Sequence, residues 1–189
     1  MMTMNDTDAV RRRNRLKLLL VAAIFLVPAM IAVGLGMSGW QPGARSHGEP
    51  ILPQRSFADV PIVLADGSKY AWRDSQPRMT LLALPGSDCL ENCVRLLGLM
   101  RNARIVLNSN ADRLRLLYVG EPPKDTGAAE LMKSWQMGHD VDGKLAAFRP
   151  HGPDSVAAIL VESNGTALAR YRAGFDPNGL RVDLQKVVR

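Results

Sequence analysis

The sequence predicts an α/β domain in which helices pack against a sheet of parallel and antiparallel strands. Two short apolar runs, 79–84 and 114–119, are bounded by turn residues and are typical of buried strands. The segment 89–105 between them has helical periodicity, which is expected of a crossover between parallel strands. A third apolar stretch, 156–171, is divided by an Asn-Gly dipeptide, which favours a tight hairpin.

Shorter elements surround this central part. Residues 61–72 contain an Asp-Gly turn between two apolar runs, which predicts a first hairpin, and residues 128–136 have the pattern of a short helix. The chain closes with an amphipathic helix over 178–188. Together the elements follow the order β-hairpin, β, α, β, α, β-hairpin, α, which is that of a thioredoxin-like α/β sandwich. The residues of the closing helix expected to face inward are Leu180, Val182, Leu184 and Val187.

The chain has two cysteines, Cys89 and Cys93, and both follow the strand 79–84 at the predicted start of a helix. Asp88 is the predicted cap of that helix. A helix N-terminus stabilises a thiolate, the form that binds soft metals and attacks disulfides. Positions four apart on a helix suit a shared metal ion, and they permit a disulfide if Cys89 lies at the cap. Two inert buried thiols, or a bridge with a structural role alone, remain the alternatives.

The N-terminus predicts a membrane anchor. Five Lys and Arg residues in the tail 1–17 precede the uncharged run 18–37, which is long enough to cross a bilayer core of about 30 Å. A cleavable signal peptide would have a shorter apolar core of about 7–15 residues. We therefore expect a retained transmembrane helix, with the tail in the cytoplasm and the rest of the chain on the far side.

The segment 38–55 is rich in Gly, Pro and Ser and reads as a linker, which leaves 56–189 as one globular domain. The chain carries 24 Lys and Arg against 18 Asp and Glu, a net charge of +6. Because half of this excess lies in the N-terminal tail and no basic stripe with interleaved aromatic residues occurs, we expect no nucleic-acid partner.

Several motifs of the domain resemble those of the Sco family, the membrane-anchored thioredoxin-fold factors of cytochrome c oxidase assembly. The cysteines have C-x-x-x-C spacing at the strand-to-helix corner. The run YVGEPPKDT, residues 118–126, is similar to the family's strand followed by Asp-Pro-Glu-Arg-Asp-Thr. The VAAILVESNG hairpin, residues 156–165, and the single N-terminal span also match the family's layout.

The resemblance implies a copper site. Copper(I) prefers thiolates and accepts imidazole as a third ligand. The resemblance therefore implies Cys89 and Cys93 as metal ligands, but the family's histidine corresponds to Asp154 here. His151 lies three residues earlier and is the predicted third ligand, with His139 as a weaker candidate.

Three functions follow from these patterns. The first is a copper chaperone that delivers the metal to a cytochrome c oxidase subunit, by resemblance the dinuclear copper site of subunit II. The second is a thiol–disulfide oxidoreductase in which Cys89 and Cys93 form a redox pair that keeps a partner's copper-ligand cysteines reduced. The third is a non-catalytic assembly scaffold, which is favoured by Leu90 and Val94 at positions where the family carries proline. Whether the protein is an enzyme depends on which applies.

The resemblance also implies a cellular location and partners. In a bacterium the domain would be periplasmic, on a single-pass protein of the inner membrane, where disulfides form. Its expected partners are an oxidase subunit or another assembly factor, together with membrane lipid around the one span.

Overall fold

The computed structural model describes residues 4–38, 46–125 and 127–188 of the chain. It divides into two compact units, Met1–Arg45 and Ser46–Arg189. The described part of the first unit is helix α1 (Met4–Ser38), which includes the predicted span 18–37. Among the described residues, no helix combines the length and the apolar character needed to cross a membrane. The transmembrane helix and the cytoplasmic tail therefore stay predictions.

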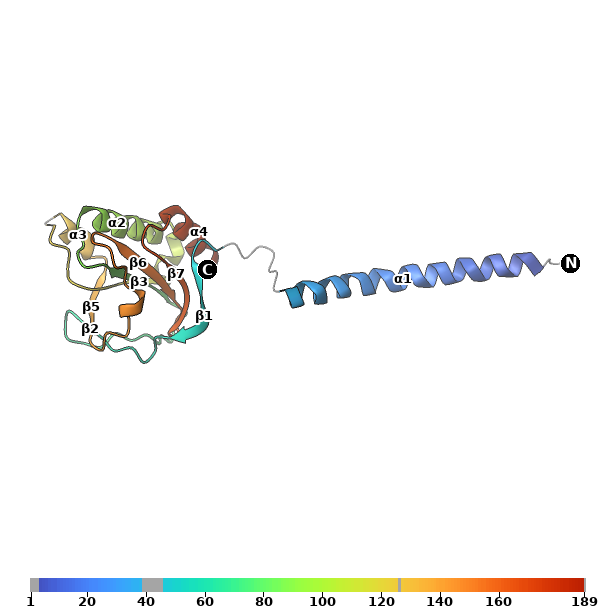
Figure 1. Ribbon diagram of the computed structural model, residues 1–189, viewed down its shortest axis with the longest axis horizontal. Helices are drawn as coiled ribbons and strands as arrows, with labels where there is room; N and C mark the ends of the chain where they lie inside the picture. Colours follow the sequence, from blue (N-terminus) through green and yellow to red (C-terminus); the bar gives the residue numbers. More distant parts are fainter. Residues whose placement is uncertain (1–3, 39–45, 126, 189) are drawn as a thin grey trace. The chain divides into compact units, whose positions relative to one another are not determined.

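The described part of the second unit contains one sheet of seven strands in the order β1-β7-β6-β3-β4-β5-β2 (Figure 1). Strand β4 is parallel to both β3 and β5, and the other neighbours are antiparallel. This mixture of parallel and antiparallel pairs confirms the predicted α/β fold. The strands are β1 (Glu49–Ser56), β2 (Ile62–Leu64), β3 (Met79–Pro85), β4 (Leu114–Val119), β5 (Gln136–Asp140), β6 (Val156–Val161) and β7 (Thr166–Tyr171).

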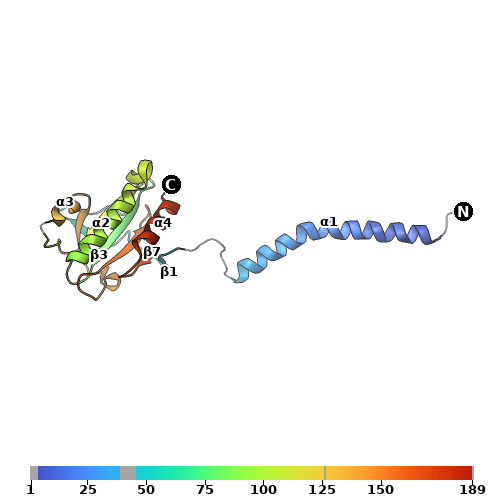
Figure 2. The same cartoon turned by 90° about the horizontal axis from the view of Figure 1, so that it is seen from above.

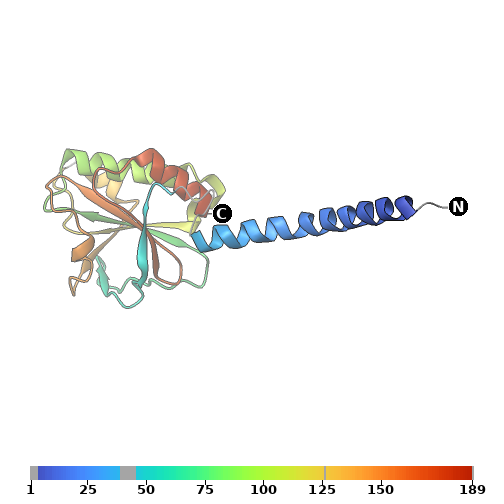
Figure 3. The same cartoon turned by 45° about the vertical axis from the view of Figure 1, so that its right-hand side comes forward.

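Helices cover one face of this sheet. Figures 1 and 3 show α2 (Glu91–Ile105) and α4 (Pro177–Val187) on the same side, and Figure 2 shows them from above. Their buried leucines share a core with the sheet residues Leu81 and Tyr118. The remaining helical segments are short: α3 (Ala128–Met132) and the 3₁₀ turns Asn108–Arg113 and Ala146–Phe148.

The opposite face of the sheet has a second apolar core, which is built around aromatic rings. Phe57 contacts both Trp72 and Phe148 edge to face, with ring centroids 5.6 Å and 5.4 Å apart. Because both faces are covered, β3 and β6 are buried along their whole lengths. This burial explains why these strands appear in the sequence as continuous apolar runs.

The predicted linker 38–55 is wrong in its second half. Residues 39–45 lie outside the described residues, but Glu49–Ser56 is strand β1, paired antiparallel with β7. Pro50 and Pro53 made this segment look like a tether. Proline cannot donate to a strand ladder, so it is tolerated on an edge strand, and β1 is such an edge. The domain therefore begins at Ser46 rather than at Ser56.

Two further elements differ from the sequence-based expectation. The predicted helix 128–136 ends at Met132, because residues from Gln136 onward pair with β4 as strand β5. The first predicted hairpin keeps its turn, and Val63 bridges Lys69, but β2 finds its main partner in β5. In both places pairing with a distant strand overrides the local pattern.

The closing helix buries a carboxylate that the sequence analysis did not select. Leu180 and Leu184 face the core as predicted, whereas Val187 is exposed and Asp183 is buried. The Asp183 carboxylate accepts hydrogen bonds from the backbone N–H groups of His47 and Gly48, at 2.7 Å and 3.1 Å. The Ser46 hydroxyl and the Tyr171 phenol also donate to it. Asp183 therefore fastens the start of the domain to α4.

Replacing Asp183 by Ala is expected to lower the free energy of unfolding by about 2–3 kcal/mol, because the buried Gly48 N–H and Tyr171 phenol lose their acceptor. Burial alone would raise the pKa of Asp183, but the hydrogen bonds from His47, Gly48 and Ser46 lower it below its usual value. A carboxyl whose pKa falls on folding stabilises the fold above its unfolded pKa, about 3.9, and loses that contribution as the pH falls through the folded value.

The loss caused by Asp183→Ala should therefore be larger at pH 7 than at pH 3 in urea denaturation. The control is Glu130→Ala, which removes an exposed carboxylate paired with Lys133 at 2.6 Å and should cost at most about 1 kcal/mol. An equal loss at both pH values would contradict the role of the ionised Asp183 carboxylate.

Candidate active site at the cysteine corner

The two cysteines lie where β3 turns into α2. Strand β3 ends at Pro85, and the Gly86 N–H donates to the Ser155 carbonyl at 2.8 Å. Cys89 follows in the turn, and Cys93 lies in the first turn of α2. The two residues form a disulfide, with their Cα atoms 5.1 Å apart. The corner therefore brings the predicted redox pair into direct covalent contact.

The two sulfur-bearing residues differ in accessibility. Cys89 is 7% exposed and lines a cavity of about 590 Å³, whereas Cys93 is fully buried in the core beneath α2. An incoming thiol can thus approach Cys89 through the cavity, while Cys93 is shielded. The two cysteines therefore differ in how readily a group outside the domain can reach them.

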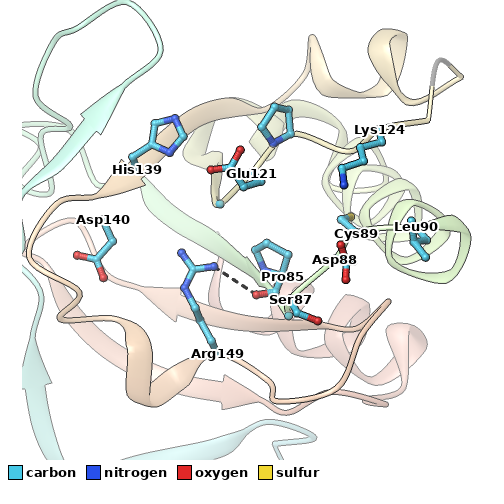
Figure 4. Close-up of a pocket in the computed structure, with 13 residues that line it drawn as sticks. Pro85, Ser87, Asp88, Cys89, Leu90, Glu121, Lys124, His139, Asp140 and Arg149 are labelled. Atoms are coloured by element: carbon cyan, nitrogen blue, oxygen red, sulfur yellow. Dashed lines mark hydrogen bonds between the residues drawn. The ribbon is translucent and has the colours of Figure 1, made fainter.

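The cavity wall is part polar and part apolar and carries charges of both signs. Figure 4 shows His139, Asp140 and Arg149 on one side of the cavity and Lys124 near Cys89 on another. The volume falls in the usual range of about 300–1,000 Å³ for ligand-binding pockets. It is lined by Pro85, Gly86, Ser87, Asp88, Cys89, Leu90, Gly120, Glu121, Pro122, Lys124, His139, Asp140 and Arg149.

Two hydrogen bonds fix this wall in place. Arg149 Nη1 donates to the Pro85 carbonyl at 3.3 Å, which ties the loop before β6 to the end of β3. The Tyr118 hydroxyl donates to the Glu121 carbonyl at 2.6 Å. Burial raises the pKa of Tyr118 to about 12, so the phenol stays protonated and keeps this bond at neutral pH.

The start of α2 is capped by a carboxylate from another part of the chain. Leu90 is the N-cap residue and has no side-chain acceptor. Asp154, in the loop before β6, accepts hydrogen bonds from the N–H groups of Leu90 at 3.0 Å, Asn92 at 3.0 Å and Cys93 at 2.9 Å. These N–H groups have no acceptor within the helix, so the Asp154 carboxylate caps the N-terminus of α2.

The backbone of Asp154 strengthens the same connection. Its N–H donates to the Asp88 carbonyl at 3.0 Å, and its carbonyl accepts from Asn92 Nδ2 at 3.1 Å. Asp154 has φ +47°, in the left-handed region that Asp adopts more readily than most residues. Desolvation would raise the pKa of Asp154, but the N–H bonds from Cys93, Asn92 and Leu90 lower it below the usual value. The group at this corner is therefore a carboxylate anion at neutral pH.

The structure brings Cys89 and Cys93 together but does not place His151, the predicted third copper ligand, in the cavity beside them. His151 is exposed in the loop before β6 and is not among the residues that line the cavity, whereas His139 does line it. Within the described part of the chain, no three His, Cys, Asp or Glu side chains are grouped so that they could hold a metal ion. Asp88 is not the side-chain cap that the sequence predicted, since Asp154 holds the N–H groups instead. A third metal donor beside Cys89 and Cys93 is thus missing from this site.

Asp154 and Arg149 are the site residues whose roles the sequence did not reveal. One signal was present for Asp154: the Sco resemblance aligned it with the family's metal-binding histidine. Its actual bonding depends on a contact between residues 61–64 positions apart, which no local pattern contains.

Comparison with protein families places this corner in a known group. A family model described as "Transmembrane-like, thioredoxin-like, C-terminal domain" matches residues 79–189, which is more than half of the chain. The chain belongs to this family. In this thioredoxin-like family member, the matched region begins with β3 and includes both cysteines and Asp154. No curated protein sequence matches the chain.

Solved structures agree with the fold of this thioredoxin-like protein. Apo Sco1 from Thermus thermophilus superposes with a TM-score of 0.52 at 16% identity, covering 78% of this chain and 96% of that one. Copper-bound ScoI from Arabidopsis thaliana superposes with a TM-score of 0.50 at 14% identity, covering 76% of this chain and 99% of that one. Xanthomonas campestris bacterioferritin comigratory protein has a TM-score of 0.49 at 12% identity, covering 76% of this chain and 97% of that one. The similarity to the two Sco structures, with TM-scores of 0.52 and 0.50, supports a thioredoxin-like fold.

Proposed function

We propose that this protein is a thiol–disulfide oxidoreductase whose Cys89–Cys93 pair exchanges with a disulfide of a partner protein. The observation that carries the proposal is the bonded pair at the strand-to-helix corner, with Cys89 at the wall of a cavity and Cys93 in the core. This arrangement supports Cys89 as the attacking cysteine and Cys93 as the resolving cysteine.

The reaction proceeds in two exchange steps. The Cys89 thiolate attacks one sulfur of the partner's disulfide, which breaks that bond, forms a mixed disulfide and releases the partner's other sulfur as a thiolate. Cys93 then attacks the Cys89 sulfur, forms the Cys89–Cys93 bond and releases the partner's second thiolate. Two electrons pass from the cysteine pair to the partner, and the two protons of the pair end on the partner's thiols.

Membership of the Sco family, with copper delivery, is the second candidate. The C-x-x-x-C spacing supports it, because two thiolates four residues apart can hold one soft ion. The rest of the donor set does not fit a three-ligand copper site. Asp154 is a hard carboxylate already bonded to three N–H groups, and His151 lies outside the cavity that Cys89 lines. We therefore rank disulfide exchange above copper delivery.

The proposed setting is the periplasmic face of a bacterial inner membrane, with a single anchor over 18–37. The support is the basic cluster before an uncharged run, together with a bonded cysteine pair, since disulfides persist most readily in oxidising compartments. The proposed substrate is the copper-ligand cysteine pair of a cytochrome c oxidase subunit, or a second assembly factor. The cavity beside Cys89 offers a path by which a partner's disulfide can approach this residue.

A stoichiometric test separates the two candidates. Reduced full-length protein is mixed with a peptide that carries two cysteines in a disulfide, and free thiols are counted by alkylation and mass spectrometry. We expect one peptide disulfide to be reduced per Cys89–Cys93 bond formed. In parallel, Cu(I) is titrated against a competing chelator into the wild type and His151→Ala. Failure to reduce the peptide, together with Cu(I) binding that weakens in His151→Ala, would favour copper delivery instead.

A further inference from the structure

The start of α2 holds two features that compete for the same groups. Unpaired N–H groups at a helix N-terminus stabilise a nearby thiolate, and this lowers the pKa of cysteines at such positions. Here the N–H groups of Leu90, Asn92 and Cys93 are already bonded to the Asp154 carboxylate, at 2.9–3.0 Å. These three N–H groups are therefore not available to stabilise a thiolate at Cys89.

The charge of Asp154 acts in the same direction. A negative group beside a thiol disfavours the thiolate, whereas it has no such effect on an uncharged disulfide. The bonds that the Asp154 backbone makes with the Asp88 carbonyl and the Asn92 side-chain amide hold the carboxylate against the cysteine turn. The carboxylate therefore affects the reduced state of the pair more than the oxidised state.

We propose that Asp154 is a positioning residue that sets the redox equilibrium of the Cys89–Cys93 pair towards the disulfide. The inference rests on the proposed disulfide exchange and adds the direction in which the pair works. With glutathione as the probe, the Cys89–Cys93 bond breaks, a bond forms between two glutathione sulfurs, and two electrons and two protons pass from glutathione to the cysteines. By withholding the N–H groups from a thiolate, Asp154 disfavours the reduced product. The reduced pair is consequently a stronger electron donor, which suits a protein that reduces its partner.

The test compares full-length wild type with Asp154→Asn in glutathione buffers of graded redox ratio. Asparagine removes the charge and replaces one of the two acceptor oxygens by an amide donor, so at least one of the three N–H groups is released. Asparagine is still a good helix cap, so the fold should be kept. We expect the equilibrium constant to move about tenfold towards the dithiol, which corresponds to a reduction potential higher by about 30 mV. The pH profile for alkylation of Cys89 should shift to lower pH in the variant.

Glu91→Gln is the matched control. Glu91 is an exposed carboxylate in the first turn of α2, so its loss changes the charge by the same amount without releasing the N–H groups that Asp154 holds. We expect its equilibrium constant to stay within twofold of wild type. Thermal unfolding of both redox forms adds a second readout. Asp154→Asn should destabilise the reduced form less than the oxidised form, whereas a cap with no redox role would affect both equally.

The outcomes separate this inference from the proposed function. If wild type reaches equilibrium with glutathione but Asp154→Asn has the same constant, or if Glu91→Gln shifts it equally, the role of Asp154 is overturned and disulfide exchange stands. If wild type does not exchange with glutathione at all, both proposals fall.

Discussion

Replacing Cys89 by Ser is expected to reduce disulfide exchange with a peptide to the rate of the uncatalysed reaction. The reason is that the accessible nucleophile is lost, while Cys93 is fully buried and cannot take over the attack. The measurement is the rate at which a peptide disulfide is reduced by stoichiometric protein, followed by alkylation of the released thiols.

Cys93→Ser is the informative companion variant, because it keeps the attacking thiol and removes the resolving one. We expect it to accumulate a mixed disulfide between Cys89 and the peptide, which intact-mass spectrometry detects as an adduct of the peptide's mass. If instead the adduct accumulates on Cys93 in the Cys89→Ser variant, the roles assigned to the two cysteines are reversed.

Gly86→Ala is expected to destabilise the domain by about 2–3 kcal/mol and to separate the loop before β6 from the cysteine turn. A Cβ atom at Gly86 would collide with the Gly152 carbonyl oxygen and lie 2.8 Å from the Ser155 hydroxyl. The backbone oxygen cannot move aside as the end of a flexible side chain can. Since this loop carries Asp154, the substitution should also change the redox equilibrium of the cysteine pair. Urea denaturation and glutathione equilibration measure the two effects.

Gly98→Ala is the control, and it is expected to raise the free energy of unfolding rather than lower it. Gly98 lies inside α2, and the nearest atom to a new Cβ would be Leu131 Cδ2 at 4.0 Å. Alanine in a helix interior is more favourable than glycine by about 1 kcal/mol, so this variant should be slightly more stable than wild type. If Gly86→Ala and Gly98→Ala have similar effects, the close contact at Gly86 does not constrain the corner.

Much of the fold could be predicted from local patterns. The strands β3, β4, β6 and β7 and the helix α2 all lie where the sequence predicted them, within two residues at each end. Each of these elements contains its own signal: an apolar run bounded by turn residues, an Asn-Gly turn, or a helical repeat of buried side chains. The position of Cys89 and Cys93 at the β3–α2 corner was predictable for the same reason.

The incorrectly predicted elements depend on partners far away in the sequence. Strand β1 resembles a linker until β7 pairs with it, and β5 resembles the end of a helix until β4 pairs with it. The burial of Asp183 likewise requires Ser46, His47 and Gly48, 135–137 residues earlier in the chain. Hydrophobic periodicity carries no information about such contacts.

In the candidate site, too, some features follow from the local sequence and others depend on distant contacts. The position of two thiols at the start of a helix after a buried strand could be predicted, because strand burial, turn chemistry and helix periodicity are local properties of the chain. The groups that surround the two thiols depend on how distant parts of the chain fold together. Folding brings Asp154 against the N–H groups of the cysteine turn, 64 positions from Leu90, and leaves His151 exposed outside the cavity. Because the neighbouring groups determine whether a thiol pair binds a metal or exchanges electrons, the choice between copper and redox chemistry depends on the fold.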